Sequence, residues 1–330
     1  MSGKYMAYVG SYSYTGKAKG ITVFDVDVKN GTFRERCEME VDNSSYVIAS
    51  SDGKTLYSIA DEGVVSFRIL QNVTGVLTCA LPIYDGKATV LSLNKDGSVG
   101  EIVDGVFDKG YGSVAERNFR SHVTCTRRMP DGRYVLSVDN GTDQVKVYRF
   151  NDKDKRLFQL DAIHCDLESA PRHFRYSSDG RFLYLMHELQ NVICVYSYET
   201  GDRAPVVEKI QTISTTSTKN PGNLTAACAM RLSPDEKFVY CTNAGENTVS
   251  IYSRDEKSGL LTMICCLPVS GEYPKDVAIF PDQKHIASIN HDSGSISFFE
   301  VDYEKGLIVM CGRSVMVNEP NCCAIAKIGN

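Results

Sequence analysis

The sequence contains no stretch that approaches the roughly 20 consecutive apolar residues of a membrane-spanning helix. Residues 1–10 run almost directly into a strand-like pattern and offer no signal-peptide core. The chain also has no block of lysine and arginine, and its formal net charge is −5, whereas nucleic-acid-binding proteins present a basic face. We therefore expect a soluble, cytoplasmic protein with no membrane partner and no nucleic-acid partner.

Several motifs that mark cofactors, metals or nucleophiles are also absent. There is no Cys-x-x-Cys and no close histidine pair, and His187-Glu188 lacks the second histidine of a zinc protease motif. Neither Gly-x-Gly-x-x-Gly, nor a P-loop, nor the Gly-x-Ser-x-Gly of a serine nucleophile elbow occurs. The sequence thus predicts no cofactor and no metal. Its 12 cysteines are expected to be reduced thiols, because a chain of this size needs no disulfide framework.

One hairpin pattern recurs along the chain. Its clearest copy spans residues 169–188, where Asp179-Gly-Arg marks a tight turn between two alternating strands. The turn aspartates of four copies, Asp131, Asp179, Asp235 and Asp282, are 48, 56 and 47 residues apart. Each hairpin is followed by a third alternating strand and a weaker fourth, and four short strands at this period are typical of a β-propeller blade. We therefore predict an all-β, seven-bladed β-propeller that forms a single domain over residues 1–330.

The two ends of the chain and the third repeat depart from this pattern. The first unit begins at a second strand, and residues 320–328 align with inner strands, so we expect the C-terminal strand to close the propeller. Asp52 and Asp131 are 79 residues apart, although two periods must fit between them. Residues 85–93 match a third strand and leave no room for an inner hairpin before it. The third blade is thus expected to be truncated, either by a real deletion or by a fault in the recorded sequence.

Residues equidistant from each hairpin turn are expected to gather on one face, around the central channel. Arg172 and Glu188, for example, are equidistant from Gly180. The polar residues predicted on this face are His122, Arg172, His173, Glu188, Asn243, Lys275, Asn290 and Asn321. Arginine and lysine could fix a small anionic ligand, and histidine or glutamate could transfer a proton. Two plainer interpretations are a structural ion pair between Arg172 and Glu188 and a hydrogen-bonded rim histidine at position 122.

Five segments carry a resemblance to a known family: Tyr8-Val-Gly-Ser-Tyr12, Ser121-His122-Val123, Ala170-Pro-Arg-His-Phe174 with Glu188, Leu232-Ser-Pro-Asp235 with Asn243, and Tyr273-Pro-Lys-Asp276. Through them the chain resembles the seven-bladed propeller lactonases, which include propeller-type 6-phosphogluconolactonase and the carboxy-muconate lactonizing enzyme. The resemblance implies a metal-free site in which His122, Arg172 and Glu188 are catalytic. Two positions depart from the family. Lys275 replaces an arginine, which keeps the charge but loses the bidentate fork, and Ala244 stands where an arginine often follows the asparagine.

This resemblance implies hydrolysis of a phosphorylated sugar lactone, most simply 6-phospho-glucono-1,5-lactone to 6-phosphogluconate. Glu188 or His122 would activate water, and Arg172 would stabilise the oxyanion or hold the anionic group of the substrate. The residues expected to contact the small anionic lactone are Lys275, Asn243, Asn290, His173 and Asn321. Two alternatives stay open: a cycloisomerase of the muconate-lactonizing kind, and a non-catalytic propeller whose polar funnel docks a ligand or a protein.

Overall fold

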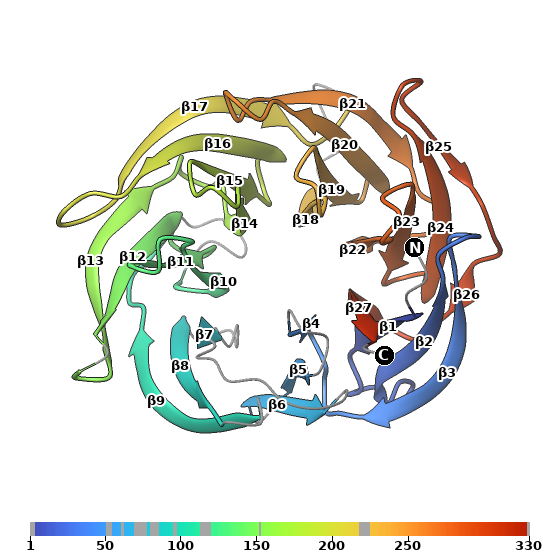
Figure 1. Cartoon of the computed structure of the whole chain (residues 1–330), viewed down its shortest axis with the longest axis horizontal. Helices are drawn as coiled ribbons and strands as arrows, with labels where there is room; N and C mark the ends of the chain where they lie inside the picture. The colour runs from blue at the N-terminus through green and yellow to red at the C-terminus, as the bar shows by residue number, and fades with distance from the viewer. Residues whose placement is uncertain are drawn as a thin grey trace.

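The computed structural model describes residues 4–50, 55–60, 63–68, 78–79, 86–94, 98–112, 120–151, 153–217 and 225–328. Within these ranges the chain forms strands and turns and no helix. The strands are grouped in seven antiparallel sheets that follow one another around a common centre (Figure 1). The prediction of an all-β, seven-bladed propeller is confirmed.

Four sheets have their strands in plain chain order. The fourth sheet contains β10 (Val123–Arg128), β11 (Val135–Asp139), β12 (Gln144–Asn151) and β13 (Arg156–His164). The fifth contains β14 (Pro171–Tyr176), β15 (Phe182–His187), β16 (Val192–Glu199) and β17 (Val206–Ser214). The sixth contains β18 (Ala226–Leu232), β19 (Phe238–Ala244), β20 (Thr248–Arg254) and β21 (Leu261–Pro268). The seventh contains β22 (Pro274–Ile279), β23 (His285–Asn290), β24 (Ser295–Asp302), β25 (Leu307–Met310) and the short β26 (Val315–Met316), which also pairs with β24.

The first sheet combines the two ends of the chain. It contains β1 (Lys4–Ser11), β2 (Gly20–Asp27), β3 (Thr32–Glu40) and β27 (Pro320–Ile328). Strand β27 lies at its inner side and pairs antiparallel with β1 over the whole length of β1 (Figure 1). The inner strand that the N-terminal segment lacks is therefore supplied from the C-terminal segment, as the sequence predicts.

The second and third sheets have three strands each in the part of the chain that the structure describes. The second contains β4 (Val47–Ala49), β5 (Thr55–Ala60) and β6 (Gly63–Arg68), and the third contains β7 (Thr78–Cys79), β8 (Lys87–Leu93) and β9 (Val99–Phe107). Strand β8 coincides with the predicted third strand at residues 85–93, and β7, only two residues long, is its inner neighbour. Much of the segment where the sequence predicts the truncation, residues 69–77 and 80–85, lies outside the described residues.

The inner hairpins form where the sequence places aspartate at the turn. In the fifth sheet the Asp179 carboxylate accepts hydrogen bonds from the backbone N–H of Arg181 (3.0 Å) and from the Ser177 hydroxyl (2.5 Å). Gly180 then adopts a φ of 72°, a left-handed conformation that glycine tolerates best. These local interactions fix the turn and hence the register of the two inner strands.

The core lies between the faces of neighbouring sheets. Phe24 and Phe33 of the first sheet are buried with Phe280 and Phe298 of the seventh. The ring centroid of Phe33 lies 5.2 Å from that of Phe280 and 5.1 Å from that of Phe298. Because burial of one such side chain contributes about 1.5–3 kcal/mol, this cluster firmly joins the last sheet to the first.

Candidate functional site

A β-bulge recurs near the start of five inner strands. The pairing register shifts there between β10 and β11, β14 and β15, β18 and β19, β22 and β23, and β27 and β1. A bulge leaves one extra residue unpaired and changes the direction of its side chain. The five extra residues are Thr124, Arg172, Cys228, Lys275 and Asn321. They lie at the same end of their strands, and we call this end of the channel the mouth.

Arg172 is held at the mouth by contacts to two sheets. Its guanidinium pairs with Glu188, with 2.7 Å between Nη1 and Oε2, and its Nε–H donates to the carbonyl of Cys228 at 2.9 Å. The side chain of Arg172 is 30% exposed and that of Glu188 only 3%. Burial acts to lower the pKa of Arg172, but the Glu188 carboxylate outweighs it and raises that pKa. Arg172 therefore stays charged, and its side chain is partly exposed.

Glu188 receives a second hydrogen bond from the neighbouring sheet. The Asn140 side-chain amide donates to the same Oε2 at 3.2 Å and to the carbonyl of Ala170 at 3.3 Å. Asn140 is buried, and it follows β11 as Glu188 follows β15. Arg172 and Asn140 thus orient the carboxylate from two sides. The sequence places Asn140 at this end of its hairpin, but it was not predicted as a site residue.

His122 precedes β10 and is positioned by Asp139. Its backbone N–H donates to Asp139 Oδ1 at 2.8 Å, and Asp139 Oδ2 accepts from the Ser121 hydroxyl at 2.6 Å and from Lys146 Nζ at 3.2 Å. Burial and the nearby Arg172 guanidinium lower the pKa of His122, although Glu188 and Asp139 act in the opposite direction. At neutral pH the imidazole is therefore neutral and able to accept a proton.

Lys275 and Asn321 form a second polar group at the mouth. Lys275 Nζ donates to Asn321 Oδ1 at 2.9 Å and lies 4.8 Å from the ring centroid of Tyr12 and 5.6 Å from that of Tyr273. The two aromatic faces stabilise the ammonium group by cation–π attraction. Tyr12 and Tyr273 were not predicted as site residues, although each belongs to a segment that carries the family resemblance.

The residue before each of three inner strands has a left-handed backbone. Ala170, Tyr273 and Glu319 have φ values of 51°, 56° and 48°, and each precedes a proline that starts β14, β22 or β27. Non-glycine residues in this region carry a conformational cost of the order of 1 kcal/mol. A residue with this strained backbone therefore lies two positions before each of the bulged residues Arg172, Lys275 and Asn321, and it helps to fix the direction of their side chains.

Asn243 and Asn290, two further predicted site residues, are held by hydrogen bonds near the ends of β19 and β23. Both are fully buried. The Asn243 amide donates to the carbonyl of Thr215 at 2.7 Å and to Thr248 Oγ1 at 3.0 Å, and Asn290 accepts from the Ser288 hydroxyl at 2.7 Å. Asn243 is thereby linked to its own sheet through Thr248 and to the segment after β17 of the fifth sheet through Thr215. Direct contact of these two residues with a substrate stays a prediction.

His173 lies next to the bulge but belongs to a different environment. Burial and the nearby guanidinium groups of Arg175, Arg172, Arg231 and Arg127 lower its pKa well below the ordinary value. Three of these arginines are farther along the inner strands than Arg172. His173 therefore lies within the electrostatic influence of Arg172 and of these three arginines.

The described residues include no group of three or more histidine, cysteine, aspartate or glutamate side chains placed to hold a metal ion. They also include no helix with the length and apolar character needed to cross a membrane. The eleven cysteines whose side chains are described form no disulfide with one another, and Cys37 is exposed whereas the others are buried or half-buried.

Known proteins of similar sequence and structure share this architecture. The 6-phosphogluconolactonase of Bacillus subtilis is 26% identical over 306 residues, covering 84% of this chain and 86% of its own. A crystal structure described as a putative 6-phosphogluconolactonase from Bacteroides fragilis matches with a TM-score of 0.84 at 28% identity, over 99% of both chains. The periplasmic gluconolactonase of Pseudomonas aeruginosa shares the fold, with a TM-score of 0.87 at 24% identity over 99% of this chain and 100% of that one.

A family model also matches the chain directly. The model described as lactonase, 7-bladed beta-propeller matches residues 6–80 and 83–325. The interruption at residues 81–82 falls in sequence between β7 and β8, in the segment where the sequence predicts a truncation. Fold, inner-strand pattern and family model agree, and the chain belongs to the seven-bladed β-propeller lactonase family.

Proposed function

We propose that this lactonase hydrolyses a phosphorylated sugar lactone, most simply 6-phospho-glucono-1,5-lactone, to the aldonic acid. The observation that carries the proposal is the charged pair of Arg172 and Glu188 at the mouth, beside a neutral His122. The names of the Bacillus subtilis and Bacteroides fragilis relatives support this substrate class. At 26–28% identity these names favour the phosphorylated lactone without assigning it to this chain.

In the proposed reaction, the lactone carbonyl binds at the exposed part of the Arg172 guanidinium. A water molecule attacks the carbonyl carbon, and its proton passes to His122. Arg172 stabilises the negative charge that develops on the carbonyl oxygen, as a preorganised donor in a partly desolvated site. The ring C–O bond then breaks, the ring oxygen takes a proton from His122, and the aldonic acid leaves with its hydroxyl restored.

His122 is the better candidate for the base. Oε2 of Glu188 already accepts hydrogen bonds from Arg172 and Asn140, and a carboxylate so bound is a weak proton acceptor. His122 instead has a lowered pKa and is deprotonated at neutral pH. Glu188 then acts as a positioning residue that holds the direction of Arg172.

The position of Lys275 supports an anionic substrate. It lies at the same mouth, and Asn321, Tyr12 and Tyr273 hold its ammonium group in place. A single ammonium can attract a phosphate as a point charge, although it lacks the bidentate geometry of arginine. We infer that Lys275 helps to bind the substrate and does not take part in the proton transfer.

The test is hydrolysis by the purified protein of phosphorylated and unphosphorylated gluconolactone, each corrected for the spontaneous rate. Arg172→Met is expected to lower kcat/KM by about 100-fold or more, the usual cost of removing one oxyanion donor. Arg133→Met, an exposed arginine at a hairpin turn, is the matched control and leaves kcat/KM unchanged.

Three outcomes would contradict the proposal. Conversion of a carboxy-muconate without hydrolysis of any lactone would identify a cycloisomerase. Failure of the folded wild-type protein to act on any lactone would identify a binding propeller. If Arg172→Met and Arg133→Met hydrolyse the lactone equally well, the proposed role of the mouth is wrong.

A further inference from the structure

Three arginines occupy the same position on three consecutive inner strands. Arg127 of β10 pairs with Leu136, Arg175 of β14 with Tyr184, and Arg231 of β18 with Tyr240. Each lies three residues beyond the bulge of its strand. At about 3.3 Å per residue, this places them about 10 Å farther along the strand direction than the bulged residues. They therefore form a second level of positive charge, distinct from the mouth.

Contacts between distant sheets show that this level lies in the channel. The Arg231 guanidinium carbon is 6.0 Å from the ring centroid of Tyr46, which precedes β4 of the second sheet. Arg231 belongs to the sixth sheet, and the seventh and first sheets lie between the two. Its Nη2 also donates to the carbonyl of Cys323 on β27 at 3.3 Å. A side chain that meets both must extend across the centre of the propeller.

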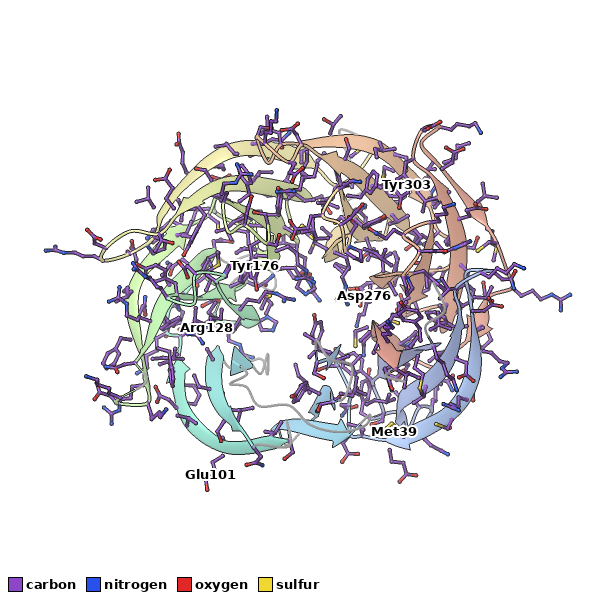
Figure 2. The ribbon with its side chains drawn as sticks, viewed as in Figure 1. Met39, Glu101, Arg128, Tyr176, Asp276 and Tyr303 are labelled. Atoms are coloured by element: carbon purple, nitrogen blue, oxygen red, sulfur yellow. The ribbon has the colours of Figure 1, made fainter. Side chains whose placement is uncertain are left out.

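Labelled neighbours in Figure 2 agree with this placement. Tyr176, which follows Arg175 in β14, and Asp276 of β22, which pairs with Arg231, both lie on the inner side of the ring of sheets (Figure 2). Arg127, Arg175 and Arg231 are half-buried, as expected for side chains that line a channel open to solvent.

The positive charge at this level is poorly balanced. Asp276 pairs with Arg231, with 2.9 Å between Nε and Oδ1, whereas Arg127 and Arg175 have no ion pair within the described ranges. Arg175 donates to the carbonyl of Phe174 at 2.8 Å. Nε of Arg127 and Nδ1 of His173 are buried without a hydrogen-bond partner in the described structure. Equivalent positions on β22 and β27 are Ala278 and Ala324, which supply no countercharge.

The surroundings disfavour the positive charge of Arg175. Burial and the neighbouring Arg127 guanidinium lower the pKa of Arg175 to about 10, and Arg231 contributes a smaller effect in the same direction. Unsatisfied buried donors and repelling cations each cost stability. Both costs are offset when an oxyanion with several acceptor oxygens enters, because arginine forks bind such groups through paired hydrogen bonds.

We propose that Arg127, Arg175 and Arg231 form a binding site in the channel for a phosphate group, either as free phosphate or as part of a phosphorylated sugar. His173 lies at the same site. Its Nδ1, which has no hydrogen-bond partner in the described structure, can donate a hydrogen bond to the oxyanion or accept one from it. The site does not depend on lactone hydrolysis, because anion binding requires only the guanidinium groups.

The experiment is calorimetric titration of the full-length protein with inorganic phosphate, which needs no turnover. The wild-type protein is expected to show saturable binding. The double variant Arg127→Gln/Arg175→Gln should bind at least about tenfold more weakly, since each charge-assisted hydrogen bond removed weakens binding by this order. Arg156→Gln, on the exposed outer strand β13, is the matched control and binds phosphate as the wild type does.

A thermal measurement separates a binding role from a structural one. Without phosphate, Arg175→Gln alone is expected to melt at a higher temperature than the wild type, because burial and the Arg127 guanidinium disfavour the charge of Arg175. With phosphate, its melting temperature should rise less than that of the wild type. No saturable binding to the wild type, or equal affinity of the wild type and the double variant, would overturn the proposal.

Kinetics distinguish the two sources of the phosphate group. If the substrate carries it, Arg127→Gln raises KM for the phosphorylated lactone and leaves KM for the unphosphorylated lactone unchanged. If free phosphate is the ligand, the variant loses phosphate binding while the ratio of the two KM values stays that of the wild type. Both results support the site and assign its ligand.

Discussion

At the scale of single residues, the state of His122 depends on Arg172. Burial first and then the Arg172 charge lower the pKa of His122, and a base must be deprotonated to act. We therefore expect kcat/KM to fall as the pH falls through the pKa of His122, which lies below its ordinary value of about 6.5. Above that pH the imidazole is neutral and kcat/KM is constant with respect to this group.

The corresponding prediction concerns the variant Arg172→Met. Removal of the guanidinium leaves Glu188 as the nearest strong influence, so the pKa of His122 should rise. The measurement is an NMR titration of the His122 ring proton in the wild type, in Arg172→Met and in the control Arg133→Met. An unchanged His122 pKa in Arg172→Met would show that the two side chains are not coupled, and the assignment of His122 as the base would lose its physical basis.

The residue scale also shows the limit of counting along the sequence. Counting outward from the turns correctly brought Arg172 and Glu188 together, because each lies at the open end of its strand. The same counting assigned Asn243 and Asn290 to the mouth, but these residues are equivalent to His187, one position before Glu188. In a strand, a shift of one residue moves a side chain to the opposite face, so Asn243 and Asn290 correspond in register to His187 and not to Glu188.

At the scale of strands and hairpins, local sequence was sufficient for most of the fold. Asp-Gly turns and alternating strands are short-range signals, and the hairpins of the fourth to seventh sheets lie where the sequence predicts them. The bulges were not predicted, because they arise where two strands pair with unequal numbers of residues. The recurring proline at the start of β14, β22 and β27 was the available signal, since it follows a left-handed residue in each case.

The element with the clearest individual role is β27. Truncation after residue 319 would leave the inner edge of β1 unpaired and remove Asn321 from Lys275. We expect the melting temperature to fall by more than about 5 °C, since a loss of several kcal/mol shifts it by about 2–4 °C per kcal/mol in a protein of this size.

Removal of residues 329–330 alone is the control and should leave the melting temperature unchanged. A synthetic peptide of residues 320–328, added to the truncated chain, should restore part of the loss by pairing with β1. If the chain truncated after residue 319 melts at the temperature of the full chain, the pairing of β27 with β1 contributes nothing to stability.

At the scale of the whole molecule, the third sheet is distinguished by the short strand β7 in the part of the chain that the structure describes. On its inner side, β8 pairs with β7, which has only two residues. The equivalent strand of the fifth sheet, β15, has six residues. The sequence predicted this shortage from the distance between Asp52 and Asp131, a simple count that needs no structural detail. How the chain covers the faces of the neighbouring sheets could not be predicted, because that depends on packing between elements far apart in sequence.

A chain with a complete inner hairpin inserted before β8 should therefore be more stable than the present one. The added strands would bury apolar side chains against the second and fourth sheets, and each such side chain contributes about 1.5–3 kcal/mol. The measurement is a comparison of melting temperatures by calorimetry. Equal melting temperatures would show that the short third sheet costs the protein no stability.

The recurring bulge has a consequence for how such a protein changes over time. Each of five sheets places one bulged residue at the mouth. Neighbouring bulged residues are linked by hydrogen bonds: Thr124 Oγ1 donates to the carbonyl of Arg172 at 2.7 Å, and Arg172 Nε donates to the carbonyl of Cys228. Exchange of a bulged side chain removes its own bond to the neighbouring carbonyl, but the backbone pairing of its strand does not depend on that side chain. Substrate preference can drift one blade at a time, by single substitutions that leave the packing between sheets untouched, and Lys275 in place of arginine is one such exchange.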